Sequence, residues 1–499
     1  MRNVLRNNTV AVVLPLLFAF VGIFIREMLP KSPFHTFLPG PSSSWGTRPG
    51  SPAHPLFLHI QVSDADAAPR LHVVTFRPEP GGRPRPEYAG PADHVRTSGN
   101  RLNFRISTEG VSFSGTISSG TLSGTWTNAD SSSFPVIMDV VAPPPFLYTH
   151  QQPRPPFPYI AEEVTVSGGL FRPRLSGTLT RPAAPGSFPA VLLLSGQGPE
   201  GRDAENQFHR PFLVWADHLT RMGMVVLRCD DRGVGLSEGD FNAATTADFA
   251  ADARMCLDFL KARPEVHSGR IGMLGHSEGG LVAATVAAES PDVGFIVLLA
   301  PPVCPMKEIW KHQFGVMARR NGLDARTEKL GEEFIEGAWR NLAANSATYW
   351  GRNSFRNYFI EYMNGIPEKD RRLLGFPANE QDEAAIEKEL NVWCTPWKYF
   401  ITRFDAADAY NRVACPVLGV FAGLDEQILP KPNAELLETL LKTGRNPPLR
   451  LHVFPDLEHG MRRPINYNAA SYPLSETVAI EVLELVSSWI TSLPEKAQY

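Results

Sequence analysis

The chain has 499 residues, of which 20% are charged and 43% are hydrophobic, and its formal net charge is -4. This composition is typical of globular proteins, and the length predicts two or more structural units rather than one core. The small negative charge excludes the basic surplus that nucleic-acid binding requires. We therefore expect no nucleic-acid partner and take a small molecule as the default ligand.

The N-terminus begins with a basic segment and an apolar run. Arg2 and Arg6 precede residues 10–25, which carry no charge, and charged residues resume at Arg26. A positive start followed by an unbroken apolar segment is the pattern of an export signal. The run is short for a membrane span, and no small-residue cleavage site follows closely, so residues 1–29 predict either a cleaved signal or a membrane anchor. We expect an exported protein that is membrane-anchored, secreted or periplasmic.

Two linkers and a β region follow. Residues 30–54 are rich in Pro, Ser and Gly without an apolar period, which predicts a flexible linker. Residues 55–142 contain the period-two alternation of half-buried strands, as at 102–106, and predict a small antiparallel β domain. The prolines in 143–160 predict a second, stiff linker, because successive prolines fix the backbone.

The segment 161–499 alternates apolar strands with helix-length stretches, which predicts a mostly parallel sheet flanked by helices. The alternation stops over 301–414, which is too long for an ordinary connection and has helical spacing, so we expect an inserted helical cap. A last helix is expected over 475–490. The expected strands are at 190–194, 224–228, 270–274, 295–300, 417–421 and 449–454.

The five cysteines are scattered along the chain without close pairs. This spacing indicates neither a zinc site nor a disulfide framework. In an exported protein one disulfide stays open as an alternative, but the sequence does not assign it.

A possible nucleophile lies directly after one of the expected strands. Residues 275–279 read Gly-His-Ser-Glu-Gly, which fits the pattern G-x-S-x-G, and a helical stretch follows at 280–288. The pattern alone is weak, but strand, turn and helix are the setting that a nucleophile elbow requires. We predict Ser277 as the nucleophile.

Two later strands are each followed by a candidate partner for this serine. A serine hydroxyl is a poor nucleophile near neutral pH, so a base must take its proton and an acid must orient that base. At an elbow of this kind the acid and the histidine follow the serine in chain order. Asp425 comes after one strand, with Glu426 as the less favoured substitute. Only His452 and His459 lie beyond it, and His452 falls inside a strand, so we predict the triad Ser277, Asp425 and His459.

Two backbone amides are candidates for an oxyanion hole. The glycine-rich loop at 195–199 directly follows a strand, and glycine permits close approach of the backbone to a ligand. We predict that the N–H groups of Gln197 and Glu278 donate to the oxyanion. Asp230, Asp231 and Arg232 could be mistaken for further catalytic groups. Their spacing suits a turn, in which the arginine ties the loop to carbonyls or carboxylates.

These residues carry a family resemblance. The segments 194–199, 230–235 and 275–280, with Arg202 and Asp203, are similar to the oxyanion, post-strand and elbow motifs of bacterial alpha/beta hydrolases of the secreted esterase and prolyl-oligopeptidase-like group. The likeness covers about two-thirds of the chain, and the β domain resembles, less specifically, one that precedes the hydrolase in some secreted esterases. It implies the alpha/beta-hydrolase fold. Glu200 and Gly201 depart from the residues that the resemblance implies at the rim of the site.

The sequence thus predicts a serine hydrolase that cleaves carboxylic esters through an acyl-enzyme, without a metal or organic cofactor. Its expected partner is a small acyl ester, and the oligomeric state is left open. The helical cap is expected to act as a lid over Ser277, because it leaves and rejoins the sheet near the elbow. Two alternatives remain: a peptidase of the prolyl-oligopeptidase-like kind, and a non-catalytic binding protein on a relic hydrolase fold.

Overall fold

The chain forms two compact units, of which the first comprises Met1–Leu147 and Asn206–Phe208 and the second comprises Tyr148–Glu205 and His209–Tyr499. The computed structural model describes residues 42–47, 56–61, 70–77, 85–106, 110–118, 120–129, 131–140, 151–169, 172–206, 209–464 and 476–494. The predicted export segment, including residues 10–25, lies outside these residues. Among the described residues, no helix has both the length and the apolar character needed to cross a membrane.

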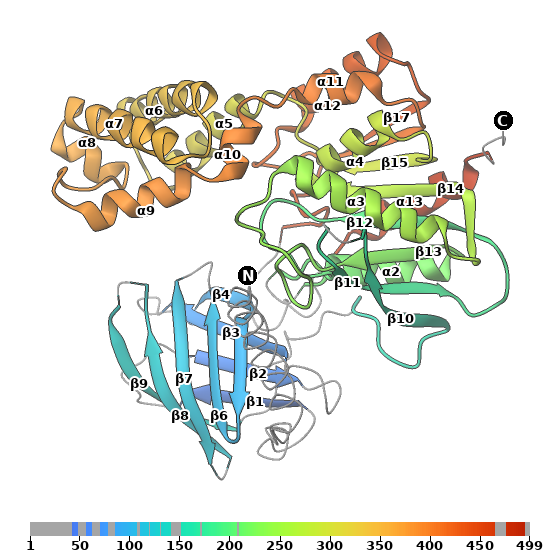
Figure 1. Cartoon of the computed structure of the whole chain (residues 1–499), viewed down its shortest axis with the longest axis horizontal. Coiled ribbons are helices and arrows are strands. Elements are labelled where there is room, and N and C mark those ends of the chain that lie inside the picture. Colours follow the sequence, from blue (N-terminus) through green and yellow to red (C-terminus); the bar gives the residue numbers. More distant parts are fainter. Residues whose placement is uncertain are drawn as a thin grey trace, which may run out of the picture. The chain divides into compact units, whose positions relative to one another are not determined.

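The first unit is a nine-stranded antiparallel sheet in the order β4-β3-β2-β1-β9-β8-β7-β6-β5 (Figure 1). Its strands are β1 (Ser42–Thr47), β2 (Leu56–Gln61), β3 (Arg70–Arg77), β4 (Arg85–Pro91), β5 (Asp93–Ser98), β6 (Arg101–Ile106), β7 (Val111–Ser118), β8 (Thr121–Thr127) and β9 (Ser133–Val140). Alternate residues such as Leu102, Phe104 and Phe113 are buried, as the period-two pattern predicts. Strands β7 and β8 form an antiparallel hairpin that closes with the pair Ser118 and Thr121.

Strand β1 corrects one expectation. It lies within residues 30–54, which the sequence predicts to be a flexible linker. β1 pairs antiparallel with both β2 and β9, so backbone hydrogen bonds on two sides hold it in the sheet. This pairing does not require an alternating apolar pattern, and the segment Ser-Ser-Ser-Trp-Gly-Thr does not have one.

The second unit contains an eight-stranded sheet in the order β10-β11-β13-β12-β14-β15-β16-β17. Strands β10 and β11 pair antiparallel, as do β11 and β13, and all other pairs are parallel. All six predicted strands are present, which confirms the mostly parallel sheet. The strands are β10 (Tyr159–Val166), β11 (Leu175–Pro182), β12 (Phe188–Leu194), β13 (Val225–Cys229), β14 (Val266–His276), β15 (Phe295–Leu299), β16 (Val417–Ala422) and β17 (Leu449–Phe454).

Helices cover both faces of this sheet (Figure 1). Val191 and Leu193 belong to a core shared with α2 (Pro211–Arg221) and α13 (Ile480–Ser492). The intervening Ala190 and Leu192 face the opposite core. Successive residues of a strand point to opposite faces, so β12 is apolar throughout because both faces are buried. The opposite core is completed by α3 (Thr246–Lys261), α4 (Glu278–Glu289) and α12 (Pro430–Thr443).

The last helix begins later than predicted. It starts at Ile480 rather than at residue 475, which itself lies outside the described residues. The N–H of Ala479 donates to the carbonyl of Met461, and Gln151 accepts from the N–H groups of Thr477 and Val478. These contacts with other segments hold the approach to the helix in a non-helical conformation.

The predicted helical insertion is confirmed. Its helices are α5 (Met306–Arg320), α6 (Ala325–Ala344), α7 (Tyr349–Gly365), α8 (Glu368–Leu373), α9 (Glu383–Trp393), α10 (Pro396–Ile401) and α11 (Ala406–Arg412). Phe334, Phe355 and Phe359 are almost fully buried in a core of the insertion's own. Side-chain caps define several starts, as where Asp324 accepts from Thr327 N–H at α6. The cap is therefore a packed subdomain rather than a long loop.

Candidate active site

Ser277 lies in a sharp turn between β14 and α4. Its φ is 53°, in the left-handed region that residues other than glycine seldom adopt. A Cβ on Gly279 would lie 2.2 Å from the carbonyl oxygen of Leu194, and one on Gly275 would lie 2.1 Å from the carbonyl oxygen of Gly279. Neither position has room for a side chain. The two glycines of the motif therefore allow the tight strand-turn-helix geometry of a nucleophile elbow.

Asp425 and His459 are brought together from the ends of β16 and β17. His459 Nδ1 lies 2.7 Å from Asp425 Oδ2, and the side chain of Asp425 is only 1% exposed. The other carboxylate oxygen accepts from the N–H groups of Gln427 and Ile428, at 2.8 and 2.9 Å. The carboxylate is thus fixed by its own loop and accepts the Nδ1 proton of His459, which orients the ring and leaves Nε2 as the basic atom.

His276 joins this pair to the elbow. It directly precedes Ser277, and its ring centroid is 4.7 Å from that of His459. His276 Nε2 lies 2.9 Å from the carbonyl oxygen of His459. Because a carbonyl can only accept, His276 Nε2 carries the proton. Burial lowers the pKa of His276 to about 4, so this ring is a neutral donor near neutral pH.

The reactive atoms are left without protein partners. Within the described parts of the chain, neither Ser277 Oγ nor His459 Nε2 makes a hydrogen bond. Catalytic hydrogen bonds are often long before substrate binds and tighten in the complex. The structure thus brings the predicted acid and base into contact beside the predicted nucleophile, and their catalytic roles stay predictions. His276 was not predicted as a site residue, and only its variable place in the G-x-S-x-G motif marked it.

The predicted oxyanion donors lie in two neighbouring segments. Gln197 is on the loop after β12, and a Cβ on the adjacent Gly196 would be 3.4 Å from Ser277 Cβ. Glu278 is the first residue of α4, where a backbone N–H has no carbonyl partner within the helix. The loop and the elbow therefore lie side by side, while donation from Gln197 and Glu278 to an oxyanion stays a prediction.

Asp231 fastens the loop that carries Gln197. Its Oδ1 accepts from Ser195 Oγ at 2.9 Å, and its Oδ2 accepts from Glu200 N–H at 3.0 Å. The N–H of Asp231 in turn donates to the carbonyl of Glu200. One carboxylate thus holds both ends of the loop. The sequence predicted a structural role for Asp231 but not this contact.

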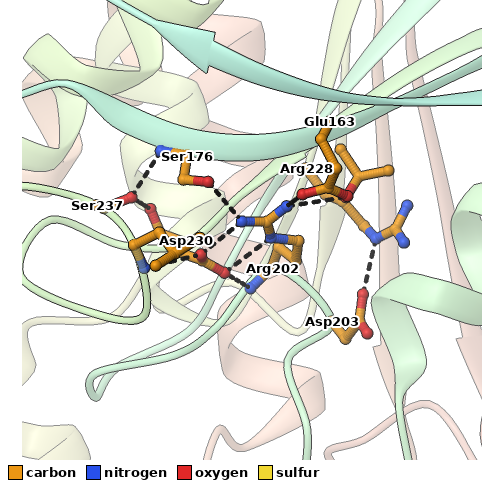
Figure 2. A network of polar contacts seen from close by, with 9 residues as sticks. Glu163, Ser176, Arg202, Asp203, Arg228, Asp230 and Ser237 are labelled. Atoms are coloured by element: carbon orange, nitrogen blue, oxygen red, sulfur yellow. Dashed lines mark hydrogen bonds and ion pairs between the residues drawn. The ribbon is translucent and has the colours of Figure 1, made fainter. Parts of the chain in front are cut away.

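Asp230 and Arg232 are held in separate ion pairs. Arg202 donates to both oxygens of Asp230, at 3.0 and 2.7 Å, in the network of Figure 2. Arg232 donates to both oxygens of Asp252, at 2.7 and 2.8 Å. The prediction that Arg232 ties its loop to nearby carboxylates is confirmed. Both pairs are bidentate, a geometry that suits a structural role.

Several carboxyl groups close to the elbow have unusual protonation equilibria. Burial raises the pKa of Asp231 to about 7 and that of Glu200 to about 8, and it also raises the pKa of Glu278. Asp231 and Glu278 line a small cavity of about 60 Å³ together with Cys229 and Cys256. Glu278 is buried, whereas Asp231 and Glu200 are half-buried, and the three acids form one cluster at the loop that carries Gln197.

No group of His, Cys, Asp and Glu residues in the described part of the chain is arranged to hold a metal ion. All five cysteines are free thiols. Cys229 and Cys256 are neighbours, with their sulfur atoms 3.7 Å apart.

Comparison with known proteins adds a family and several relatives. A family model described as X-Pro dipeptidyl-peptidase (S15 family) matches residues 173–455, a range that includes Ser277 and Asp425. Esterase EstD of Thermotoga maritima is 26% identical over 337 residues, which are 66% of this chain and 67% of EstD. An uncharacterized protein of Mycobacterium tuberculosis is 31% identical over 142 residues, 28% of this chain and 43% of that protein. Among solved structures, the Pyrococcus furiosus esterase Pf2001 aligns with a TM-score of 0.37 and 19% identity, over 61% of this chain and 83% of that one.

Proposed function

The chain belongs to the X-Pro dipeptidyl-peptidase (S15) family, and from this premise we propose that it is a serine hydrolase that cleaves carboxylic ester bonds. The observation that carries the proposal is the 2.7 Å contact between Asp425 and His459 beside the strained turn at Ser277. The relative from Thermotoga maritima is named an esterase, which supports esters as the substrate class.

The reaction begins when Ser277 Oγ attacks the acyl carbonyl carbon and its proton passes to His459 Nε2. Asp425 stabilises the imidazolium that forms, and the N–H groups of Gln197 and Glu278 donate to the oxyanion of the tetrahedral intermediate. The intermediate collapses as His459 protonates the departing alcohol. Water, deprotonated by His459, then attacks the acyl-enzyme and releases the acid and Ser277.

A peptidase of the prolyl-oligopeptidase-like kind is the second candidate, and the family match is the observation that favours it. The same nucleophile, base and oxyanion donors would cleave an amide, so substrate choice depends on the pocket rather than on the triad. The third reading, a binding protein on a relic fold, predicts an inert Ser277.

Labelling with a fluorophosphonate probe tests the proposal, because this reagent modifies only an activated serine. We expect the wild-type chain to be labelled at Ser277 and Ser277→Ala to remain unlabelled. Rates on acetyl and longer acyl esters and on aminoacyl and X-Pro amides then separate the candidates. If X-Pro amides are turned over faster than any ester, the peptidase becomes the favoured function. If Ser277 is not labelled, the non-catalytic binding protein is favoured.

We also propose that residues 1–29 direct export and leave the protein membrane-anchored, secreted or periplasmic. The charges at Arg2 and Arg6 before the apolar run 10–25 support this, since translocation machinery reads such a pattern. Fractionation of cells that express the full chain, or a chain beginning at residue 30, tests it. Equal distribution of the two chains would contradict it.

A further inference from the structure

The side chain of Glu278 is bound from two directions. Its Oε1 accepts from Thr246 Oγ1 at 2.7 Å and from the indole Nε1 of Trp397 at 2.6 Å. Trp397 Nε1 also lies 3.1 Å from Thr246 Oγ1, so the three groups form a closed triangle. Thr246 is the first residue of α3, whereas Trp397 lies on α10 in the cap, 119 positions from Glu278. The triangle therefore joins the cap and the core at the residue after the nucleophile.

Glu278 is an unusual residue to bury at this place. A glutamate in the first turn of a helix usually remains in solvent, where it still interacts favourably with the helix dipole. Glu278 is only 5% exposed, and in the described part of the chain no arginine or lysine forms an ion pair with it. Burying a carboxyl group costs free energy unless hydrogen bonds compensate. The bonds from Thr246 and Trp397 supply that compensation, and they lower a pKa that burial raises.

The backbone of Glu278 is the part that would take part in the reaction. Its N–H belongs to the peptide group that joins Ser277 to Glu278. The backbone of Ser277 has φ 53° and ψ −122°. A backbone in such a rarely populated conformation persists only where its surroundings over-determine it. Fixing the Glu278 side chain fixes its Cα and with it the direction of this N–H.

We propose that Trp397 and Thr246 are positioning residues that act through Glu278 to aim its N–H at the oxyanion. The inference rests on the proposed function, since it assigns a task to the oxyanion hole of that reaction. It makes the cap part of the catalytic machinery: when α10 is seated, the indole holds the donor in place. Displacement of α10 frees the Glu278 side chain and loosens the hole.

Substitution of Trp397 by phenylalanine tests this, because it removes the indole donor and keeps an aromatic ring in the cap. We expect kcat on an acetyl ester to fall about tenfold, less than the loss on deleting an oxyanion donor outright, with KM changed less than twofold. The affinity for a boronic acid, which mimics the tetrahedral intermediate, falls by the same factor as kcat. The matched control is Trp339→Phe, an equal change in the cap's cluster of tryptophan rings at a residue that makes no hydrogen bond to Glu278 among the described residues.

Variants at Glu278 and Thr246 separate positioning from packing. Glu278→Met, of similar length, loses the acceptor and lowers kcat as Trp397→Phe does, whereas Glu278→Gln, which keeps an oxygen that accepts from both donors, loses less kcat than Glu278→Met. Thr246→Val preserves shape and removes the hydroxyl, and it lowers kcat in the same way. If Trp397→Phe does not fold, this variant decides the matter. Unchanged kcat in a folded Thr246→Val or Trp397→Phe variant, or an equal loss in Trp339→Phe, overturns the inference.

Fluorophosphonate labelling keeps the two proposals apart. Wild-type protein that is not labelled at Ser277 contradicts the serine hydrolase and with it this inference. The other outcome is that wild-type protein is labelled and active, and that Trp397→Phe has the same kcat and the same affinity for the boronic acid. This outcome contradicts only the positioning role and leaves the serine hydrolase in place.

Discussion

Two buried charged clusters of the hydrolase unit use similar groups in opposite ways. In the network of Figure 2, Arg202 donates to both oxygens of Asp230, and its remaining N–H groups reach Glu163, Thr178 and Ser176. The polar side-chain atoms of Arg202 and Asp230 thus all have hydrogen-bond partners. In the second cluster, Asp425 is equally saturated, but it orients His459, whose Nε2 makes no hydrogen bond among the described residues.

The difference shows how a charged group that only stabilises the fold can be distinguished from one that can take part in a reaction. A buried ion pair with every donor and acceptor occupied can hold two loops together, but it has no atom to offer a substrate. A pair that leaves one basic nitrogen open, beside a strained serine, is less well satisfied and can accept a proton. The predictions below test whether the two clusters differ in this way.

The largest effect is expected at the nucleophile. Ser277→Ala removes the attacking oxygen, and we expect kcat for ester hydrolysis to fall by a factor on the order of 10⁶. The thermal unfolding midpoint is expected to change little, because the hydroxyl makes no hydrogen bond within the described residues. Both are measured on the same preparation. Retention of more than a thousandth of the wild-type rate would remove Ser277 from its role.

Asp425→Asn is the next largest change. The amide keeps the size of the carboxylate, but it favours the wrong tautomer of His459 and cannot stabilise the imidazolium, so we expect a loss of about 10⁴ in kcat. The fold is expected to be retained, because an amide oxygen can still accept from Gln427 and Ile428. Equal activity of Asp425→Asn and wild type would show that this cluster is structural, like the first.

Arg202→Met tests the saturated cluster, with stability as the expected readout. Asp230 would be left buried without its cation, and breaking such a pair costs about 3–5 kcal/mol of unfolding free energy. Urea denaturation measures the loss, and the double variant Arg202→Met with Asp230→Leu is expected to recover part of it. The kcat of the folded fraction is expected to stay within tenfold of wild type. A loss of 10⁴ in kcat with unchanged stability would reverse the assignment of the two clusters.

The sequence predicted much of this architecture because the decisive features are local. The six predicted strand segments match six strands of the mostly parallel sheet, and the chain order of Ser277, Asp425 and His459 predicted the candidate triad. Strand β1 was missed because its backbone, not a pattern of apolar side chains, holds it between β2 and β9.

The contacts that support the site could not be predicted. Trp397 and Glu278 are far apart in the sequence and meet only because the cap folds back onto α4. Asp230 and Asp231 are adjacent, yet one pairs with Arg202 and the other binds the loop that carries Gln197. Such assignments follow from three-dimensional packing and not from spacing along the chain.

The smallest effect is expected in a third cluster, which is intermediate between the first two. Asp231 accepts from Ser195 and Glu200, so its oxygens are occupied, but no basic side chain among the described residues pairs with it. Burial raises the pKa of Asp231 to about 7 and that of Glu200 to about 8. Repulsion from Asp231 raises the pKa of Glu200 further, and repulsion from Glu278 raises that of Asp231. Both acids are therefore more protonated in the folded chain than in the unfolded chain.

This fixes the sign of the pH dependence. Between about pH 4 and pH 8 the folded state binds more protons than the unfolded state, so the stabilisation is present at the acid end and is lost as pH rises through the folded pKa values. We expect the urea midpoint to fall from pH 5 to pH 8, and Glu200→Gln to reduce this fall, since the amide does not ionise. Glu289→Gln, at a residue paired with Arg254 on the surface, is the matched control and should leave the slope unchanged. If the midpoint of Glu200→Gln falls as steeply as that of wild type, Glu200 is ionised and solvated in the folded chain. The third cluster would then titrate like carboxylates on the surface.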